Sequence, residues 1–176
     1  MALVESVFRE VKKMGKKLRS LTPCRDKLEK PVEPAVVDIP PKMAARFGPG
    51  RMLIPTPLLV DALIHKVQKG RLVTVRQIRE RLAGDFKADV TCPLTTGIFI
   101  RIAAEAAEED LRMGREEITP YWRVVRDDGS LNEKFPGGVE AQAARLKEEG
   151  YTIEPGKGKK PPKVKDFEKH LAGLLG

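Results

Sequence analysis

The chain has 176 residues, of which 41% are hydrophobic and 33% are charged, and its formal net charge is +8. This length suits one domain with appendages, and the apolar runs are too short to cross a bilayer. Its 2 cysteines and 2 histidines lack the spacing of zinc ligands and cannot build a disulfide framework. The composition therefore predicts a soluble, cytoplasmic protein without a membrane span, a bound metal or a cofactor.

The positive charge lies at the two ends of the chain. The net charge is +5 over residues 1–46, zero over 47–150 and +3 over 151–176. Basic segments attract polyanions such as nucleic acids without sequence preference, because the neutralised phosphates release counterions. Lysine-rich ends also keep a neutral domain soluble, and the charge pattern alone does not distinguish the two roles.

The first fifty residues divide into two predicted segments. Apolar residues recur at helical spacing over residues 1–21 with lysines mostly between them, which predicts a basic amphipathic helix. Such a helix packs on its own domain or docks on a membrane surface, a nucleic acid or a partner protein. Prolines interrupt the next stretch, so residues 22–50 are predicted to form an extended linker.

Three helices are predicted next. Thr56 followed by Pro57 provides a hydroxyl cap and a proline at the first helical position. A second helix is expected to begin at Thr74, after a short extended stretch, and a third at residues 91–93. The order helix, short strand, helix, turn and helix is typical of a helix-turn-helix or winged-helix domain.

A strand and a further helix complete the predicted domain. Residues 121–125 predict a strand, residues 127–129 a turn and residues 139–149 a helix. Residues 154–176 predict a basic linker, rich in glycine, lysine and proline, with a short last helix. The expected fold is mainly α with a short β element: a winged-helix domain over residues 51–153 between basic N- and C-terminal segments.

Three strings in this domain point to a known family. They are Gly70-Arg71-Leu72-Val73-Thr74, then Pro120-Tyr121-Trp122-Arg123-Val124-Val125 with Asp128-Gly129, and last Phe135-Pro136-Gly137-Gly138. In these strings and in its order of elements, the chain resembles the C-terminal domain of alkylguanine-DNA alkyltransferases and of the non-catalytic alkyltransferase-like proteins. The match covers roughly residues 55–153. The resemblance implies a DNA-binding winged-helix domain whose partner is double-stranded DNA.

The resemblance also implies that the family's reaction is lost. In the family, a cysteine thiolate activated through a histidine, a water and a glutamate takes an alkyl group from a flipped-out guanine. The matching positions here hold Tyr121, Trp122 and Ala143, and Val75 stands where the family has the tyrosine that helps to rotate the base. A phenol with an ordinary pKa of about 10 and no neighbouring base cannot replace the thiolate. We therefore expect no alkyl transfer.

Two roles are open for the pocket that the resemblance implies. The predicted pocket residues are Tyr121, Trp122, Arg123, Phe135 and Pro136. The aromatic rings either form a stacking platform for a base or plug the pocket as part of the core.

The predicted DNA surface lies mainly on the third helix, because the first turn of the last helix of a helix-turn-helix domain faces the major groove. The predicted contacts are the hydroxyls of Thr91, Thr95 and Thr96, together with Arg101 and Arg76. By the resemblance, Arg101 is also the best candidate for the arginine that the family inserts into the vacated base position. Four acidic residues between positions 105 and 110 would repel phosphates from the other half of this helix.

Three hypotheses for the function follow. The leading one is a non-enzymatic DNA-binding protein similar to the alkyltransferase-like DNA-repair proteins. The alternative is a protein–protein interaction module that keeps the old scaffold with a plugged pocket and docks a partner through its N-terminal helix. The third is a residual enzyme that uses Cys92, because a helix N-terminus lowers the pKa of a thiol; a buried core cysteine is the competing interpretation.

Overall fold

The computed structural model describes Arg9 and residues 23–174. The amphipathic helix predicted over residues 1–21 therefore lies outside the described residues, apart from Arg9. The docking of a partner protein on that helix stays a prediction.

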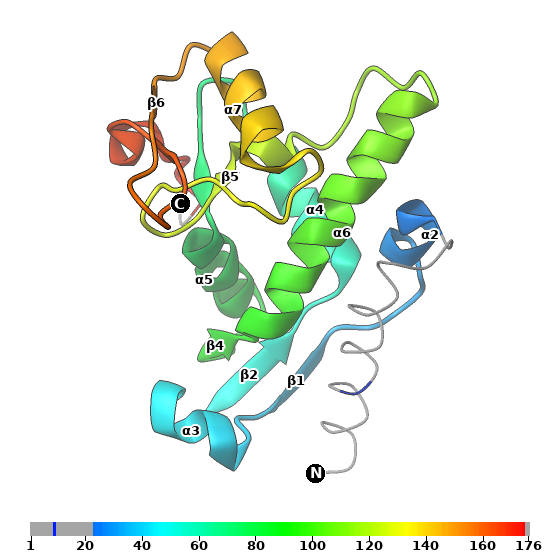
Figure 1. Ribbon diagram of the computed structural model, residues 1–176. Helices are drawn as coiled ribbons and strands as arrows, with labels where there is room; N and C mark the ends of the chain where they lie inside the picture. The colour runs from blue at the N-terminus through cyan, green and yellow to red at the C-terminus, as the bar shows by residue number, and fades with distance from the viewer. Residues whose placement is uncertain (1–8, 10–22, 175–176) are drawn as a thin grey trace.

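The described chain is a mixed α/β fold in which helices pack around small sheets (Figure 1). The helices are α2 (Cys24–Leu28), α3 (Pro41–Phe47), α4 (Pro57–His65), α5 (Val75–Asp85), α6 (Pro93–Arg112) and α7 (Gly138–Glu148). The strands are β1 (Ala35–Asp38), β2 (Arg51–Ile54), β3 (Val73–Thr74), β4 (Val90–Thr91), β5 (Val124–Val125), β6 (Ile153–Glu154) and β7 (Lys163–Val164). The 3₁₀ helices are η1 (Tyr121–Arg123) and η2 (Phe167–His170).

The strands form separate small sheets. In the first sheet β2 lies between β1, to which it is antiparallel, and β4, to which it is parallel. In the second, β3 runs parallel to β5, with Val73 opposite Val124. The third pairs β6 with β7 in antiparallel orientation. Because β3 leads directly into α5, its pairing with β5 fixes the start of that helix beside the segment that follows η1.

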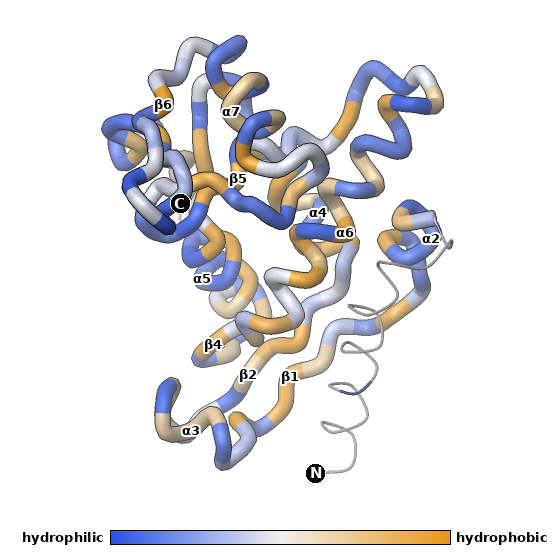
Figure 2. The backbone as a smooth tube through the Cα atoms, viewed as in Figure 1, coloured by the Kyte–Doolittle hydropathy of each residue, from blue (hydrophilic) through white to orange (hydrophobic). Residues whose placement is uncertain are grey.

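The main core lies between α4, α5 and α6. One isoleucine from each helix, Ile64, Ile78 and Ile102, is completely buried there, and each contributes about 1.5–3 kcal/mol through its burial. Figure 2 shows that β1 and β2 are mostly hydrophobic, whereas hydrophilic residues gather at the C-terminal end of α6. This shared core holds α5 and α6 in one arrangement relative to each other.

The helix starts predicted at Thr56 and Thr74 are confirmed. Thr56 Oγ1 accepts a hydrogen bond from the backbone N–H of Leu59 at 3.2 Å, and Pro57 is the first residue of α4. Thr74 Oγ1 accepts from the backbone N–H of Gln77 at 3.1 Å, while Gln77 Oε1 accepts from the backbone N–H of Thr74 at 3.0 Å. This reciprocal capping box satisfies donors that the first turn of α5 leaves without helical partners.

The cap of α5 gives a first prediction. Replacing Thr74 with alanine is expected to lower the free energy of unfolding by about 1 kcal/mol, because the first turn of α5 loses its side-chain acceptor. Urea denaturation followed by circular dichroism measures the change. The matched control is Thr152→Ala, which removes an exposed hydroxyl outside any helix and is expected to stay within about 0.5 kcal/mol. Equal losses in the two variants would contradict the capping role.

The prediction of an extended linker over residues 22–50 is wrong. This stretch holds α2, β1 and α3, and Cys24 and Leu28 of α2 are buried in the main core. The prolines begin helices rather than interrupt structure: Pro23 directly precedes α2, and Pro41 is the first residue of α3. A proline is well suited to that place because the first helical N–H has no partner within the helix.

Two expectations for the later part of the chain are corrected as well. The strand predicted over residues 121–125 is confined to Val124 and Val125, because the preceding three residues turn as η1. The basic linker predicted from residue 154 onward contains the β6–β7 hairpin, and the last predicted helix is the short 3₁₀ helix η2. The small sheets make the fold less purely helical than expected, and its assignment as a winged-helix domain stays a prediction.

Candidate functional site

An aromatic cluster occupies the position where the sequence predicts a pocket. The ring of Tyr121, in η1, meets the ring of Trp122 edge-on with centroids 5.5 Å apart. It meets the ring of Phe135 in the same way at 5.3 Å. Tyr121 is only 1% exposed, whereas Trp122 is half-buried at the edge of the core. The three rings are therefore packed against one another and leave the face of Tyr121 inaccessible to a stacking base.

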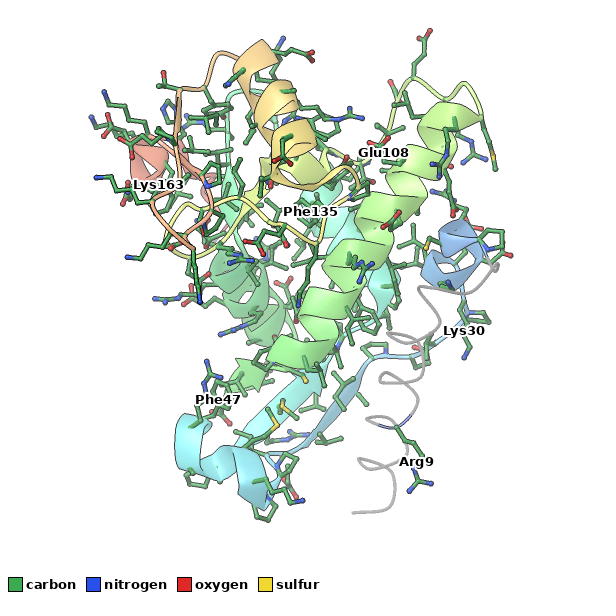
Figure 3. The ribbon with its side chains drawn as sticks, viewed as in Figure 1. Arg9, Lys30, Phe47, Glu108, Phe135 and Lys163 are labelled. Carbon is green, nitrogen blue, oxygen red and sulfur yellow. The ribbon has the colours of Figure 1, made fainter. Side chains whose placement is uncertain are left out.

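Charged side chains close the cluster from α6 and α7. Tyr121 Oη donates a hydrogen bond to Glu108 Oε1 at 2.7 Å, and Arg145 Nη2 donates to the same oxygen at 2.5 Å. The guanidinium of Arg145 lies over the Trp122 ring at 4.6 Å from its centroid and over the Tyr121 ring at 5.8 Å. Figure 3 shows Glu108 on α6 and Phe135 on the loop before α7. The cluster is thus a closed network of rings and paired charges.

The phenol of Tyr121 is held in its neutral form. Burial raises its pKa well above the ordinary value of 10, and the hydrogen bond to Glu108 and the charge of that carboxylate raise it further. A neutral phenol that donates a hydrogen bond to a carboxylate keeps its proton, so it is not the phenolate that nucleophilic attack requires. The residue at the nucleophile position therefore serves as a packed hydrogen-bond donor.

A buried ion pair anchors the rest of η1. Arg123 Nη2 lies 2.7 Å from Glu149 Oε1, and the two side chains are only 13% and 9% exposed. Glu149 Oε1 also accepts from Trp122 Nε1 at 2.9 Å, and Arg123 Nη1 donates to the backbone oxygen of Val67 at 2.5 Å. This network joins η1 to the end of α7 and to the segment after α4. Arg123 is thereby held in place by Glu149 and by the backbone of Val67.

Gln142 on α7 is a buried polar residue that binds the backbone of η1 and β5. It is 1% exposed, and its side-chain amide donates to the backbone oxygens of Trp122 and Val124 at 3.1 and 2.9 Å. Its Oε1 accepts from the backbone N–H of Asn132 at 2.8 Å. The sequence analysis missed Gln142, although it lies one helical turn before the inward-facing Leu146. A polar side chain on the buried face of a helix needs hydrogen-bond partners, so the position of Gln142 on that face could have indicated that it binds nearby backbone groups.

The acidic partners of the cluster were also missed. Glu108 was read only as part of the acidic half of the third helix. It follows the fully buried Ala104 at a spacing of four, which places the two on the same face of α6. That spacing indicates that Glu108 borders the core and needs a partner there.

The predicted DNA contacts of Thr91, Thr95 and Thr96 are wrong. These residues are 2%, 0% and 0% exposed. Their hydroxyls donate inward: Thr91 to the backbone oxygen of Arg79 at 2.8 Å, and Thr95 and Thr96 to that of Cys92 at 3.2 and 2.8 Å. The reason is that the residue before α6 is bonded to the first sheet: the N–H of Cys92 donates to the oxygen of Leu53 in β2 at 2.9 Å.

The structure does not bring Arg76 and Arg101 together. Arg76 lies in the first turn of α5, where its backbone N–H donates to Asp127 Oδ1 at 2.8 Å. Arg101 lies midway along α6 and is close enough to Cys24 of α2 for its charge to lower the pKa of that thiol against the larger effect of burial. The turn that holds Asp127 is on the left in Figure 1 and α2 is on the right. Arg101 and Arg76 therefore do not form one continuous surface.

The cysteines are core residues. Cys92 is fully buried and packs with Met52 and Ile39. Burial raises the pKa of the Cys24 thiol. Neither sulfur lies at an accessible surface, so the structure offers no support for a reactive thiol at Cys92.

Metal sites and membrane spans were searched over the same residues. Within Arg9 and residues 23–174, histidine, cysteine, aspartate and glutamate side chains nowhere gather in a group of three that could hold a metal ion. In that part of the chain no helix combines the length and the apolar character that crossing a membrane requires.

Comparison with known proteins adds no relative. No protein-family model, no curated protein and no solved structure matches the chain.

Proposed function

We propose that this chain is a non-enzymatic DNA-binding protein similar to the alkyltransferase-like proteins, built on a winged-helix domain. We further propose that it binds duplex DNA without taking a base out of the stack. The closed aromatic cluster carries this proposal. By the resemblance, a flipped base would lie beside Tyr121, but Trp122, Phe135 and Arg145 already pack against that ring. Because side chains fill the place of a flipped base, the proposal is that the protein binds the duplex with its bases still stacked.

The chemistry of the cluster supports the absence of alkyl transfer. The phenol of Tyr121 is buried, neutral and bound to Glu108. Glu108 is in turn held by Arg145, so no free base adjoins the hydroxyl to take its proton. Transfer of an alkyl group to Tyr121 would require breaking this network and exposing the oxygen.

The start of α5 is the most suitable surface for a phosphate. Arg76 is 62% exposed, and its ion pair with the half-exposed Asp127 spans 3.5 Å. A surface pair of this kind contributes between zero and about 1 kcal/mol, so a phosphate can replace the carboxylate at little cost. Its neighbour Arg81 is already bound by Asp85 and by the backbone oxygen of Leu174. We assign Arg76, the exposed arginine at the start of α5, to DNA.

Salt dependence and lesion preference test the proposal together. With a labelled duplex in fluorescence anisotropy, log K is expected to fall steeply and linearly with log salt, because binding depends on phosphate neutralisation. A duplex containing an O6-alkylguanine is expected to bind within about twofold of the unmodified duplex, since a closed cluster reads no extruded base. No binding at low salt would contradict the DNA function. A tenfold preference for the alkylated duplex would contradict the plug.

A protein–protein module is the second candidate. It is favoured by exposed apolar side chains at the end of α6, Leu111 and Met113, which follow the acidic residues of that helix. Such side chains on a charged surface are typical of protein interfaces. The same anisotropy measurement separates the two functions, because the module predicts no salt-dependent DNA binding by the full chain.

A further inference from the structure

A cavity of about 790 Å³ lies between the turn after β5 and the loop that joins β6 to β7. Its lining is strongly basic, with the positive side chains of Arg126, Lys157, Lys159, Lys160 and Lys163. Figure 3 labels Lys163 on the outer left side of the molecule, away from Glu108 and Phe135. The cavity is thus separate from the aromatic cluster, and the β6–β7 loop lies outside residues 55–153, where the family resemblance ends.

The acidic side chains of the lining bind partners within the same lining. Asp128 Oδ1 accepts hydrogen bonds from the hydroxyl and the backbone N–H of Ser130 at 2.6 and 3.1 Å. Glu154 pairs with Lys163 at 3.8 Å. Lys157, Lys159 and Lys160 are exposed, and none of them forms an ion pair with another residue of the described chain. Five cations against two carboxylates therefore leave the lining with a surplus of positive charge.

Backbone hydrogen bonds hold the lysine loop in place. The N–H of Val164 donates to the oxygen of Gly129 at 3.0 Å, and the N–H of Leu131 donates to that of Pro162 at 2.9 Å. Within the loop, a Cβ on Gly156 would lie 2.1 Å from the carbonyl oxygen of Lys160, so the close turn requires glycine there. The lysines are presented by a tethered loop rather than by a free tail, which reduces the entropy lost when a ligand binds.

We propose that this cavity binds the phosphodiester backbone of duplex DNA, with Lys157, Lys159 and Lys160 as the phosphate contacts. The lining contains no aromatic side chain on which a free nucleobase could stack. A duplex presents phosphates while its bases stay stacked, which matches a lining that is positive overall and has no aromatic ring. The inference rests on the proposed DNA-binding function and adds a second contact surface to it.

The turn that lines the cavity also contacts the start of α5. Asp127, which contacts Arg76, lies between the lining residues Arg126 and Asp128. The same turn therefore adjoins both proposed phosphate contacts, Arg76 on one side and the lysine loop on the other.

The test compares two triple variants of the full chain. K157Q/K159Q/K160Q removes the three loop charges, and K66Q/K69Q/K147Q removes three exposed lysines that do not line the cavity. Each phosphate contact contributes about 0.9 to the slope of log K against log salt. The loop variant is expected to lose about 2–3 from that slope and to bind at least tenfold more weakly at 0.1 M salt. The control is expected to change the slope by less than about 1.

The outcomes separate this inference from the proposed function. If the unmodified chain binds duplex DNA with a steep slope and the loop variant binds as the control does, the inference fails while the proposed function stands. If the unmodified chain does not bind DNA at low salt, both fail. Calorimetry with ATP tests the other source of phosphate. If the loop variant loses ATP binding while the control keeps it, and if the loop variant still binds DNA with unchanged affinity, the cavity would be assigned to a free nucleotide instead. Equal melting temperatures of the three proteins would show that folding is preserved.

Discussion

Replacing Glu149 with alanine is expected to destabilise the protein by about 3–5 kcal/mol, because the substitution leaves a buried arginine without its counter-charge. The Arg123 guanidinium donates to both carboxylate oxygens of Glu149, with distances of 2.7 to 3.1 Å. Its remaining bond, to the backbone oxygen of Val67, does not neutralise the charge. Trp122 Nε1 loses its acceptor in the same variant.

The neighbouring residue provides the matched control for this experiment. Glu148→Ala removes an exposed carboxylate from the same turn of α7 and is expected to stay within about 0.5 kcal/mol of the unmodified protein. Glu149→Gln keeps an acceptor for Trp122 but removes the charge, so its loss is expected to lie between those of the other two. Urea denaturation at neutral pH measures all three. A loss below about 1 kcal/mol for Glu149→Ala would show that Arg123 reaches water or another partner.

The features that the sequence predicted correctly depend on neighbouring residues. The starts of α4 and α5 follow from a hydroxyl and the residues directly after it, so Thr56-Pro57 and the spacing of Thr74 and Gln77 were sufficient. Glycine at position 129 predicted a turn that the structure forms with a positive φ of 81°. In each case the determining contacts lie within four residues of one another along the chain.

The features that the sequence did not predict depend on contacts between residues far apart along the chain. β1 has no local signal beyond a few apolar residues. It becomes a strand by pairing with β2, where Val37 lies opposite Met52, fifteen residues further along the chain. The threonines at the start of α6 have the polar character of a DNA-contacting turn, yet they are buried where that turn follows β4 and the N–H of Cys92 donates to the oxygen of Leu53 in β2. Which face of a helix is buried is decided by its neighbours, not by its composition.

The candidate site shows the same division. The family resemblance implied a pocket lined by Tyr121, Trp122 and Phe135, and the structure brings these three rings together at the start of η1 and the loop before α7. The sequence did not indicate Glu108 and Arg145, which are 37 residues apart and meet only when α6 and α7 pack on η1. Those two charges, rather than the rings alone, decide that the phenol is a donor and the pocket is closed.

The hydroxyl of Tyr121 is expected to make stability sensitive to alkaline pH. Burial raises the folded-state pKa of Tyr121 above its unfolded value, so its contribution is complete below about pH 10 and is lost as pH rises through that value toward the folded pKa. Tyr121→Phe removes this titration and the bond to Glu108 while it keeps the ring. At pH 7 this variant is expected to lose about 1 kcal/mol. Its stability is also expected to fall less than that of the unmodified protein between pH 9 and pH 11.

Tyr121→Ala is expected to cost about 3–5 kcal/mol, because the removed ring is 1% exposed and leaves a void between Trp122 and Phe135. If the rings plug the pocket, the folded fraction of this variant should bind duplex DNA within about twofold of the unmodified protein, since the plug touches no base. A stacking platform predicts otherwise, because each stacked base contributes about 1–3 kcal/mol and its loss weakens binding roughly 5- to 150-fold. Anisotropy at a temperature where both proteins are fully folded measures the difference, with Tyr121→Phe as the ring-preserving control. A loss of that size in the alanine variant alone would show that Tyr121 reaches DNA, and the cluster would then be a reading surface rather than a closed core.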